Sequence, residues 1–265
     1  MRRRLFALAV GAGLCLALAQ AASSALAADP PTAAAPAQPP AVAVAAVQPE
    51  ALQALERMSD YLKTLKVFQI STRTSLDLVT TDGQLVQVNG GATYKVRRPD
   101  GFVIDVKSDV KNRTFFYDGK QFTVYAPELG YYATVAAPPT IRETLDKLYV
   151  KFGLALPLED LFRWGDATDT GDEVLDSGFR VRPSTIEGVA TDHYAFREGD
   201  IDWQIWIQRG EQPLPRKVVI IDRSDPAAPA YTAVLDWNLS PTFAADAFAF
   251  RPATGAKSVR LTLAQ

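Results

Sequence analysis

Apolar residues recur at every second position between Val67 and Val135, and this period constrains the fold more than any other feature of the sequence. Successive side chains of a strand point to opposite faces, so the pattern predicts strands with one apolar and one polar face. The apolar face of the first and third strands is formed by Phe68, Ile70, Leu76, Leu78, Phe102, Ile104 and Val106. The segment therefore predicts an antiparallel meander with one apolar side.

Glycine-containing pairs divide this meander into hairpins. Asp82-Gly83 predicts a turn after the first long strand, and Gly90-Gly91 predicts a bulge in the next one. Asp118-Gly119 predicts a tight two-residue turn that places Phe115 opposite Phe122.

Three segments have the spacing of helices rather than strands. Residues 50–66 carry apolar side chains at three- and four-residue intervals, namely Leu52, Leu55, Tyr61, Leu62 and Leu65. A second helix is predicted from a Thr140 cap to Gly153, and a short third one carries Leu158, Leu161, Phe162 and Trp164. Strands then resume, with apolar faces at Ile201, Trp203, Ile205 and Ile207 and at Tyr231, Ala233, Leu235, Trp237 and Leu239.

The order is therefore a helix, about six strands, a helical insert and about five strands. This order predicts an α+β fold in which helices cover the concave face of a strongly curved antiparallel sheet of about 11 strands.

The N-terminus has the pattern of an export signal. Arg2, Arg3 and Arg4 precede an uncharged apolar run that ends in Ala25-Leu26-Ala27. We expect cleavage before Ala28 and a periplasmic mature protein; the alternatives are an uncleaved anchor, a lipoprotein signal at Cys15 and a twin-arginine signal. Residues 28–49 then predict a disordered Pro/Ala-rich linker, followed by one domain over 50–256 and a C-terminal tail over 257–265.

Loss of residues 1–27 removes three of the 28 basic residues and none of the 30 acidic ones, so the formal net charge changes from −2 to −5. It also removes the single cysteine, which excludes a disulfide or a thiolate site. A mildly acidic chain is unlike a nucleic-acid-binding protein, and without a polybasic tract we expect at most peripheral membrane association.

Few features of the sequence favour an enzyme. His193 is the only histidine and no G-x-S-x-G motif accompanies it, so we expect a structural or exposed strand histidine rather than part of a triad. The acidic stretch Asp166, Asp169, Asp172, Glu173 and Asp176 does not have EF-hand spacing and predicts a solvated loop. We expect no metal, no cofactor and no catalysis, although a two-carboxylate glycosidase would leave no such sequence signature.

Several short motifs carry a resemblance to a known superfamily. They are Val96-Arg97-Arg98-Pro99 with Phe102, Tyr117-Asp118-Gly119-Lys120 with Tyr125-Ala126-Pro127, and Phe248-Ala249-Phe250-Arg251-Pro252 with Gly255. In order and spacing the chain resembles the periplasmic lipoprotein carrier of outer-membrane sorting and its relatives. The run from Arg216 to Phe250 is most similar to a family of predicted periplasmic proteins with no assigned function, DUF2092.

The resemblance implies an incomplete barrel whose concave apolar face is covered by helices around a cavity for acyl chains. It also implies that Arg98 closes a helical lid, with Leu145, Leu148 and Phe152 on the lid helix. Strand alternation independently places Arg98 on the same face as Tyr94 and Val96. The alternative is that Arg98 reaches water while its stem packs on apolar neighbours.

The expected ligand cavity is lined by Phe102, Ile104, Phe115, Phe122, Trp203, Ile205 and Trp237, although each could belong to an ordinary core. Together with the export signal and the resemblance, these residues predict a periplasmic, non-catalytic carrier or binding protein for a lipid, a lipoprotein acyl chain or another hydrophobic ligand. The alternative is an envelope sensor or scaffold that contacts a protein partner. A hydrolase of envelope polymers is a third interpretation.

Overall fold

The structure of the protein is a computed structural model that describes residues 47–163 and 175–262. The described residues do not include the predicted signal peptide, most of the predicted linker, Trp164 or the acidic residues from Asp166 to Glu173.

The described residues form three helices and twelve strands in the predicted order. The helices are α1 (Pro49–Thr64), α2 (Ile141–Phe152) and α3 (Asp160–Arg163). The strands before α2 are β1 (Val67–Val79), β2 (Leu85–Arg97), β3 (Gly101–Ser108), β4 (Arg113–Tyr117), β5 (Gln121–Ala126) and β6 (Tyr131–Ala136). Those after α3 are β7 (Ser177–Ile186), β8 (Val189–Glu198), β9 (Ile201–Gln208), β10 (Pro215–Asp222), β11 (Ala230–Asn238) and β12 (Lys257–Ser258).

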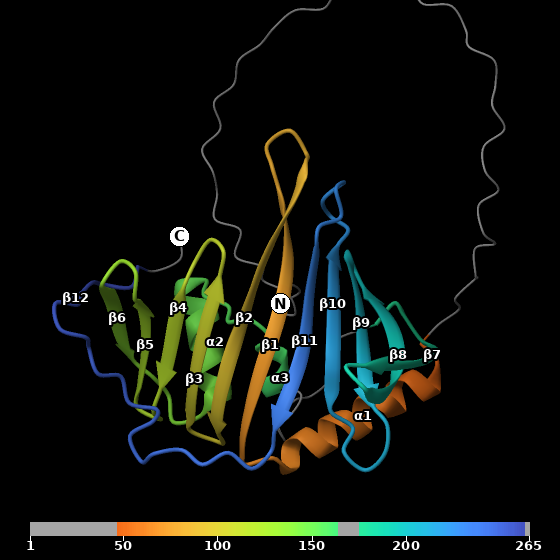
Figure 1. Ribbon diagram of the computed structural model, residues 1–265, viewed down its shortest axis with the longest axis horizontal. Coiled ribbons are helices and arrows are strands. Elements are labelled where there is room, and N and C mark those ends of the chain that lie inside the picture. The colour runs from red at the N-terminus through yellow and green to blue at the C-terminus, as the bar shows by residue number, and fades with distance from the viewer. Residues whose placement is uncertain (1–46, 164–174, 263–265) are drawn as a thin grey trace, which may run out of the picture.

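All twelve strands belong to one unclosed, curved sheet, as the α+β prediction requires. Their order is β12-β6-β5-β4-β3-β2-β1-β11-β10-β9-β8-β7 (Figure 1). The first meander, β1 to β6, and the second, β7 to β11, meet where β1 pairs with β11 from Gln69↔Asn238 to Leu76↔Tyr231. Every neighbouring pair is antiparallel except β12 and β6, which are parallel.

The helices lie on the concave side of the sheet, with α1 across the end where β1 begins, and we call this the helix end of the sheet (Figure 1). Helix α2 begins at Thr140, whose side chain accepts a hydrogen bond from the Glu143 N–H, and ends at Gly153 in the left-handed conformation with φ 61°, as predicted. In α1 most of the predicted face is confirmed: Leu62 is buried and Leu55, Tyr61 and Leu65 pack against the core, whereas Leu52 is exposed. The same helix also buries Ala51, Ala54 and Met58.

The core lies between these helices and the sheet. Its largest fully buried side chains are Phe68, Tyr94, Phe102, Tyr117 and Phe122. The ring of Phe102 lies 5.3 Å from that of Tyr117 and 6.1 Å from that of Phe162, in α3, measured between centroids. The helix end is therefore filled by the protein's own aromatic side chains.

The predicted register of β4 and β5 is wrong by two residues. Phe115 lies opposite Val124, and Tyr117 lies opposite Phe122. The cause is Asp118, whose side-chain Oδ1 accepts hydrogen bonds from the N–H groups of both Lys120 and Gln121 and so lengthens the turn. Because the shift is two residues, every side chain keeps its predicted face.

The predicted bulge at Gly90-Gly91 is also wrong, because β2 pairs with β1 without interruption over its whole length. The glycines instead permit close contact between backbones. A Cβ atom on Gly91 would lie 2.3 Å from the carbonyl oxygen of Thr72, and one on Gly90 would lie 2.5 Å from that of Lys107.

The segment after β11 crosses the helix end and continues onto the convex face (Figure 1). Phe248 is buried beside Gly101, with the Arg97 guanidinium 4.6 Å from its ring centroid. Phe250 packs against Phe116, Tyr125 and Tyr132, with ring centroids 5.0 to 5.5 Å apart. The motif Phe248-Ala249-Phe250 therefore fastens the C-terminal segment to the sheet.

We expect Gly91→Ala to lower the free energy of unfolding by about 1–3 kcal/mol, since the added methyl group would have to displace the backbone of Thr72. Urea unfolding followed by circular dichroism measures this. The control is Gln87→Ala, at an exposed position of the same strand, which should change stability by less than about 0.5 kcal/mol. Equal stability of the two variants would contradict the steric role of Gly91.

Candidate functional site

The concave face contains an apolar cavity of about 430 Å³. One wall is the part of the sheet that the helices leave uncovered, and the other is the chain between Leu154 and Leu161, which joins α2 to α3. The apolar residues that line it include Leu76, Leu78, Val88, Ala92, Val106, Val110, Phe115, Val124, Leu154, Leu156, Leu158, Trp203, Val218 and Ile220.

The inward-facing residues of each strand become more exposed away from the helix end. On β3, Phe102 and Ile104 are 0% exposed, whereas Val106 and Ser108 are only half-buried. On β1, Phe68 and Ile70 are buried, whereas Leu76 is half-buried. The same apolar face thus begins as a packed core and ends as the wall of a cavity.

The opposite wall is held in place by polar contacts. The Tyr94 hydroxyl donates a hydrogen bond to the carbonyl oxygen of Pro157 at 3.2 Å. The buried Glu159 carboxylate accepts one from the N–H of Leu156 at 3.1 Å. The first bond joins the segment to the sheet, and the second stabilises the conformation of the segment itself.

Of the predicted cavity residues, the structure places Phe115 and Trp203 in the wall. The other five predicted residues, Phe102, Ile104, Phe122, Ile205 and Trp237, do not line this cavity. Four of these five lie in the packed core instead and are 0% exposed, namely Phe102, Ile104, Phe122 and Ile205. Trp237 packs on Phe68 and donates its indole N–H to the Pro215 carbonyl at 2.8 Å.

The predicted lid residues Leu145 and Leu148 are buried in the same core, and Phe152 is partly buried against it. None of the three borders the cavity. The element that does so is the α2–α3 connection, so the cavity wall begins one residue after α2 ends at Gly153.

Arg98 lies on the concave side, whereas its neighbour Arg97 lies against Phe248 on the other. The Arg98 Nη2 donates to the carbonyl oxygen of Leu161 in α3 at 3.4 Å, and its guanidinium lies 5.9 Å from the centroid of the Phe68 ring. The turn that carries Arg98 is itself anchored, because the Ile141 N–H donates to the Pro99 carbonyl at 2.8 Å. Arg98 thus connects the sheet to the end of the cavity wall.

Tyr231 contributes a polar group to the mainly apolar wall. Enclosure by protein raises the pKa of its hydroxyl well above the ordinary value, so the group is a neutral donor and acceptor. Among the residues that the structure describes, this hydroxyl has no hydrogen-bond partner. A guest with a polar atom in this part of the cavity could bond to it.

The residues that sequence analysis missed are those farthest from the helices, among them Leu76, Leu78, Val88 and Tyr231. Their apolar periodicity was visible in the sequence. The signal that singles them out is strand length, because β1 and β2 each have 13 residues, about 40 Å, while the 12-residue α2 spans about 18 Å.

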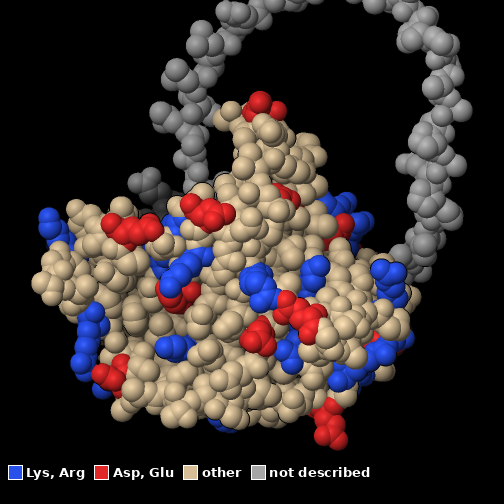
Figure 2. All heavy atoms as spheres, in the orientation of Figure 1, with Lys and Arg blue, Asp and Glu red and all other residues tan. Residues whose placement is uncertain are grey.

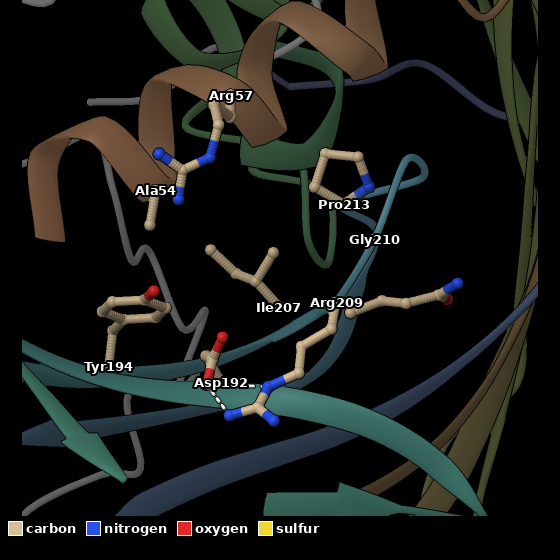
Figure 3. A pocket seen from close by; sticks show the side chains of 9 residues that line it. Ala54, Arg57, Asp192, Tyr194, Ile207, Arg209, Gly210 and Pro213 are labelled. Atoms are coloured by element: carbon tan, nitrogen blue, oxygen red, sulfur yellow. Dashed lines mark hydrogen bonds and ion pairs between the residues drawn. The ribbon is translucent and has the colours of Figure 1, made fainter. Parts of the chain in front are cut away.

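A second, smaller hollow of about 130 Å³ lies between α1 and the strands β8 and β9 (Figure 3). Its acidic residue, Asp192, accepts hydrogen bonds at 2.6 Å from both Arg209 and Arg180. Burial favours a higher pKa for Asp192, but these two hydrogen bonds outweigh it and leave the pKa below its ordinary value. The carboxylate is therefore already neutralised by its own neighbours.

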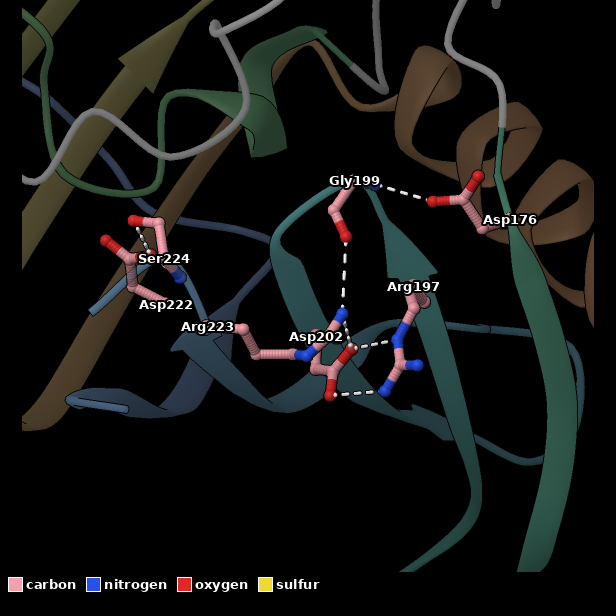
Figure 4. A network of polar contacts seen from close by, with 7 residues as sticks. All are labelled: Asp176, Arg197, Gly199, Asp202, Asp222, Arg223 and Ser224. Atoms are coloured by element: carbon pink, nitrogen blue, oxygen red, sulfur yellow. Dashed lines mark hydrogen bonds and ion pairs between the residues drawn. The ribbon is translucent and has the colours of Figure 1, made fainter. Parts of the chain in front are cut away.

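Another charged cluster joins the turns at the other end of β8 to β11 (Figure 4). Arg197 binds Asp202 through two hydrogen bonds of 2.6 and 2.9 Å, and Arg223 donates to the Gly199 carbonyl at 3.3 Å. The Gly199 N–H donates to Asp176 at 2.7 Å. These contacts hold the loops together, and the Asp202 carboxylate is paired with both Arg197 and Arg223.

His193 is a stacked strand residue. Its ring lies 3.9 Å from that of Trp206, nearly parallel, and Nε2 is 2.9 Å from the Gln204 side-chain oxygen. Partial burial lowers its pKa. Within residues 47–163 and 175–262, no three His, Cys, Asp or Glu side chains are grouped so as to hold a metal ion.

Acidic and basic side chains are interspersed over the convex face (Figure 2). None of the helices formed by described residues has the length and apolar character to cross a membrane.

Comparison with protein families identifies the chain. The model of DUF2092, described as a predicted periplasmic protein, matches residues 51–262. The chain belongs to this family. The match confirms the family predicted from the C-terminal strands and extends it over all twelve strands, α2, α3 and all but the first two residues of α1 in this DUF2092 protein. No curated protein matches the sequence.

Solved structures with similar folds include members of the lipoprotein-carrier superfamily. An uncharacterized conserved protein from Thermus thermophilus matches with a TM-score of 0.48 and 11% identity over 80% of this chain and 99% of its own. The lipoprotein LppX from Mycobacterium tuberculosis matches with a TM-score of 0.46 and 12% identity over 73% of this chain and 98% of its own. A LolA superfamily protein from Nitrosomonas europaea matches with a TM-score of 0.35 and 11% identity over 72% of this chain and 94% of its own.

We expect Arg98→Leu to loosen α3 in this DUF2092 protein, because the Leu161 carbonyl loses its charged donor. Hydrogen exchange read by mass spectrometry should become faster in peptides covering residues 154–162. Arg97→Leu is the matched control, since Arg97 pairs with Asp100 and Phe248 on the other face. Unchanged exchange in Arg98→Leu would mean that apolar packing alone holds α3.

Proposed function

We propose that the protein is a periplasmic, non-catalytic binding or carrier protein for a hydrophobic ligand, either a lipid, a lipoprotein acyl chain or another apolar molecule. The observation that carries this proposal is the apolar cavity between the uncovered part of the sheet and residues 154–161. Its volume of about 430 Å³ falls within the range of roughly 300–1,000 Å³ that is typical of small-molecule sites.

The energetics support a guest rather than water in this cavity. An apolar wall gives water too few hydrogen-bond partners, and covering it is favourable by about 25 cal/mol per Å². The wall is also continuous with a packed core, so its geometry exists before a ligand arrives. A preformed site loses little conformational entropy on binding.

The location of this function follows from the family, which is described as periplasmic. In our proposal, residues 1–27 direct export and residues 28–49 form a tether ahead of the binding domain. In the same proposal, the hydrogen bond from Arg98 to α3 keeps the cavity wall closed. Phe115 and Trp203 contact the ligand.

A cavity-filling substitution tests the proposal. Val106 lines the cavity, and Lys107, the next residue of β3, is exposed on the opposite face. Val106→Trp should weaken binding of a fluorescent fatty-acid probe by at least about tenfold, equivalent to about 1.4 kcal/mol, because the indole occupies the guest's space. Lys107→Trp should bind the probe as the unmodified protein does.

The natural guest can be sought directly. Native mass spectrometry of the protein purified after export, followed by extraction with organic solvent, should reveal a copurifying apolar molecule. If no guest is found and the probe does not bind the unmodified protein, the proposal fails. An envelope sensor or scaffold that binds a protein partner would then be the better hypothesis.

A further inference from the structure

The mouth of the cavity carries two cations. Lys111 lies in the turn between β3 and β4, Arg113 is the first residue of β4, and both border the cavity. Val110, beside them, also borders the cavity and is 65% exposed, so this turn is where the cavity meets solvent. In Figure 1 the turn is at the end of the sheet to which the β1–β2 hairpin also points.

Arg113 shares the inward face of β4 with two aromatic residues. Along that face, Tyr117 is 0% exposed, Phe115 is 6% exposed and Arg113 is half-buried. The guanidinium therefore lies at the edge of an apolar wall that excludes water. Charge interactions are stronger at such a boundary than in open solvent.

The two cations have donors to spare. Arg113 Nη1 donates to the backbone carbonyl of Asn112 at 2.6 Å, which uses one of the five N–H donors of a guanidinium. Neither Arg113 nor Lys111 forms an ion pair with any acidic side chain that the structure describes. In the same chain, Arg197 and Arg209 are both engaged with aspartates.

The carboxylates close to this turn are occupied by other partners. Asp109 accepts a hydrogen bond from the N–H of Asn89 at 2.9 Å. Glu128 accepts one from the side-chain amide of Asn112 at 2.5 Å. Neither of these carboxylates borders the cavity, and the acidic residue that does, Glu159, is buried in the opposite wall. The charged side chains that a guest meets at the mouth are therefore the two cations.

The turn that carries the cations is well defined. Ser108 Oγ donates to the carbonyl oxygen of Lys111 at 2.9 Å and accepts from its N–H at 3.0 Å. The Asn112 side chain accepts from the N–H of Ser108 at 3.2 Å. Both cations thus stand on a preorganised support, as a binding site requires.

We propose that the guest is an amphiphile whose apolar chain fills the cavity and whose anionic head, a carboxylate or a phosphate, binds Arg113 and Lys111 at the mouth. This inference rests on the proposed function and adds the class of ligand. A guanidinium with free donors binds either head through charge-assisted, bidentate hydrogen bonds.

Three ligands with one chain length test the head group. Dodecanoate, dodecyl phosphate and dodecanol can each be titrated against a neutral fluorescent probe bound to the full protein, at about pH 8, where the carboxylate is ionised. The unmodified protein should bind at least one of the two anions about tenfold more tightly than the alcohol. Which anion binds better distinguishes a free fatty acid from a phospholipid head.

Charge removal at the mouth provides the second arm. Arg113→Gln should reduce the affinity for the anion about tenfold more than the affinity for dodecanol, and Lys111→Gln should do so by a smaller factor. Lys107→Gln is the control, because it removes the same charge from the opposite face of β3, where Lys107 pairs with Asp105.

The outcomes separate the two proposals. The head-group inference would be overturned if the unmodified protein bound all three ligands with equal affinity. It would also be overturned if the anion preference survived in the double variant Arg113→Gln with Lys111→Gln. Either result would leave the carrier function intact. Failure of all three ligands and of the neutral probe to bind would refute the carrier function itself. An anion preference lost equally in Lys107→Gln would show general charge attraction and would also overturn the assignment to the mouth.

Discussion

The pairing of β1 with β11 is the interaction on which the rest of the structure depends. It joins two meanders, each built from local hairpins, into one sheet through eight residue pairs that are far apart in sequence. Local hairpins form at a low cost in chain entropy, whereas this contact must close a long loop before it gains any stability. The curvature, the common concave face and the cavity all exist only once the two meanders are joined.

A mismatch of lengths then creates the site. The central strands β1 and β2 extend well beyond the helices that cover the concave face. At the helix end, the sheet's apolar side chains meet those of α1 to α3 and form a core without a large gap. Farther along, the same face continues, but only the α2–α3 connection lies opposite, and the space between them remains unfilled. The cavity is thus a product of ordinary strand alternation and incomplete coverage rather than of special residues.

The sequence was sufficient to predict the order of elements and the concave face, because these depend on local periodicity and turn chemistry. The family was predicted separately, from the resemblance of short motifs. The cap at Thr140 and the end of α2 at Gly153 are examples. The cavity was misplaced for a physical reason: Phe102, Ile104 and Phe122 have the same alternation as Val106 and Leu76, and only tertiary contacts decide which are packed. The β4–β5 register failed because a single side chain, Asp118, lengthened the turn.

The two ends of the sheet show how an open barrel avoids a general hazard. A strand at the margin of a sheet exposes unpaired N–H and C=O groups, which can recruit a strand from another molecule. At one margin the C-terminal segment adds β12 beside β6, with the N–H groups of Lys257 and Val259 donating to carbonyls there. At the other, α1 packs on β7, and the N–H of Gln48 donates to the Gly178 carbonyl at 2.8 Å. The chain's own flanking segments therefore cover part of each margin, at Tyr131 and Tyr132 on β6 and at Gly178 on β7, and leave less of the open sheet available to a strand from another molecule.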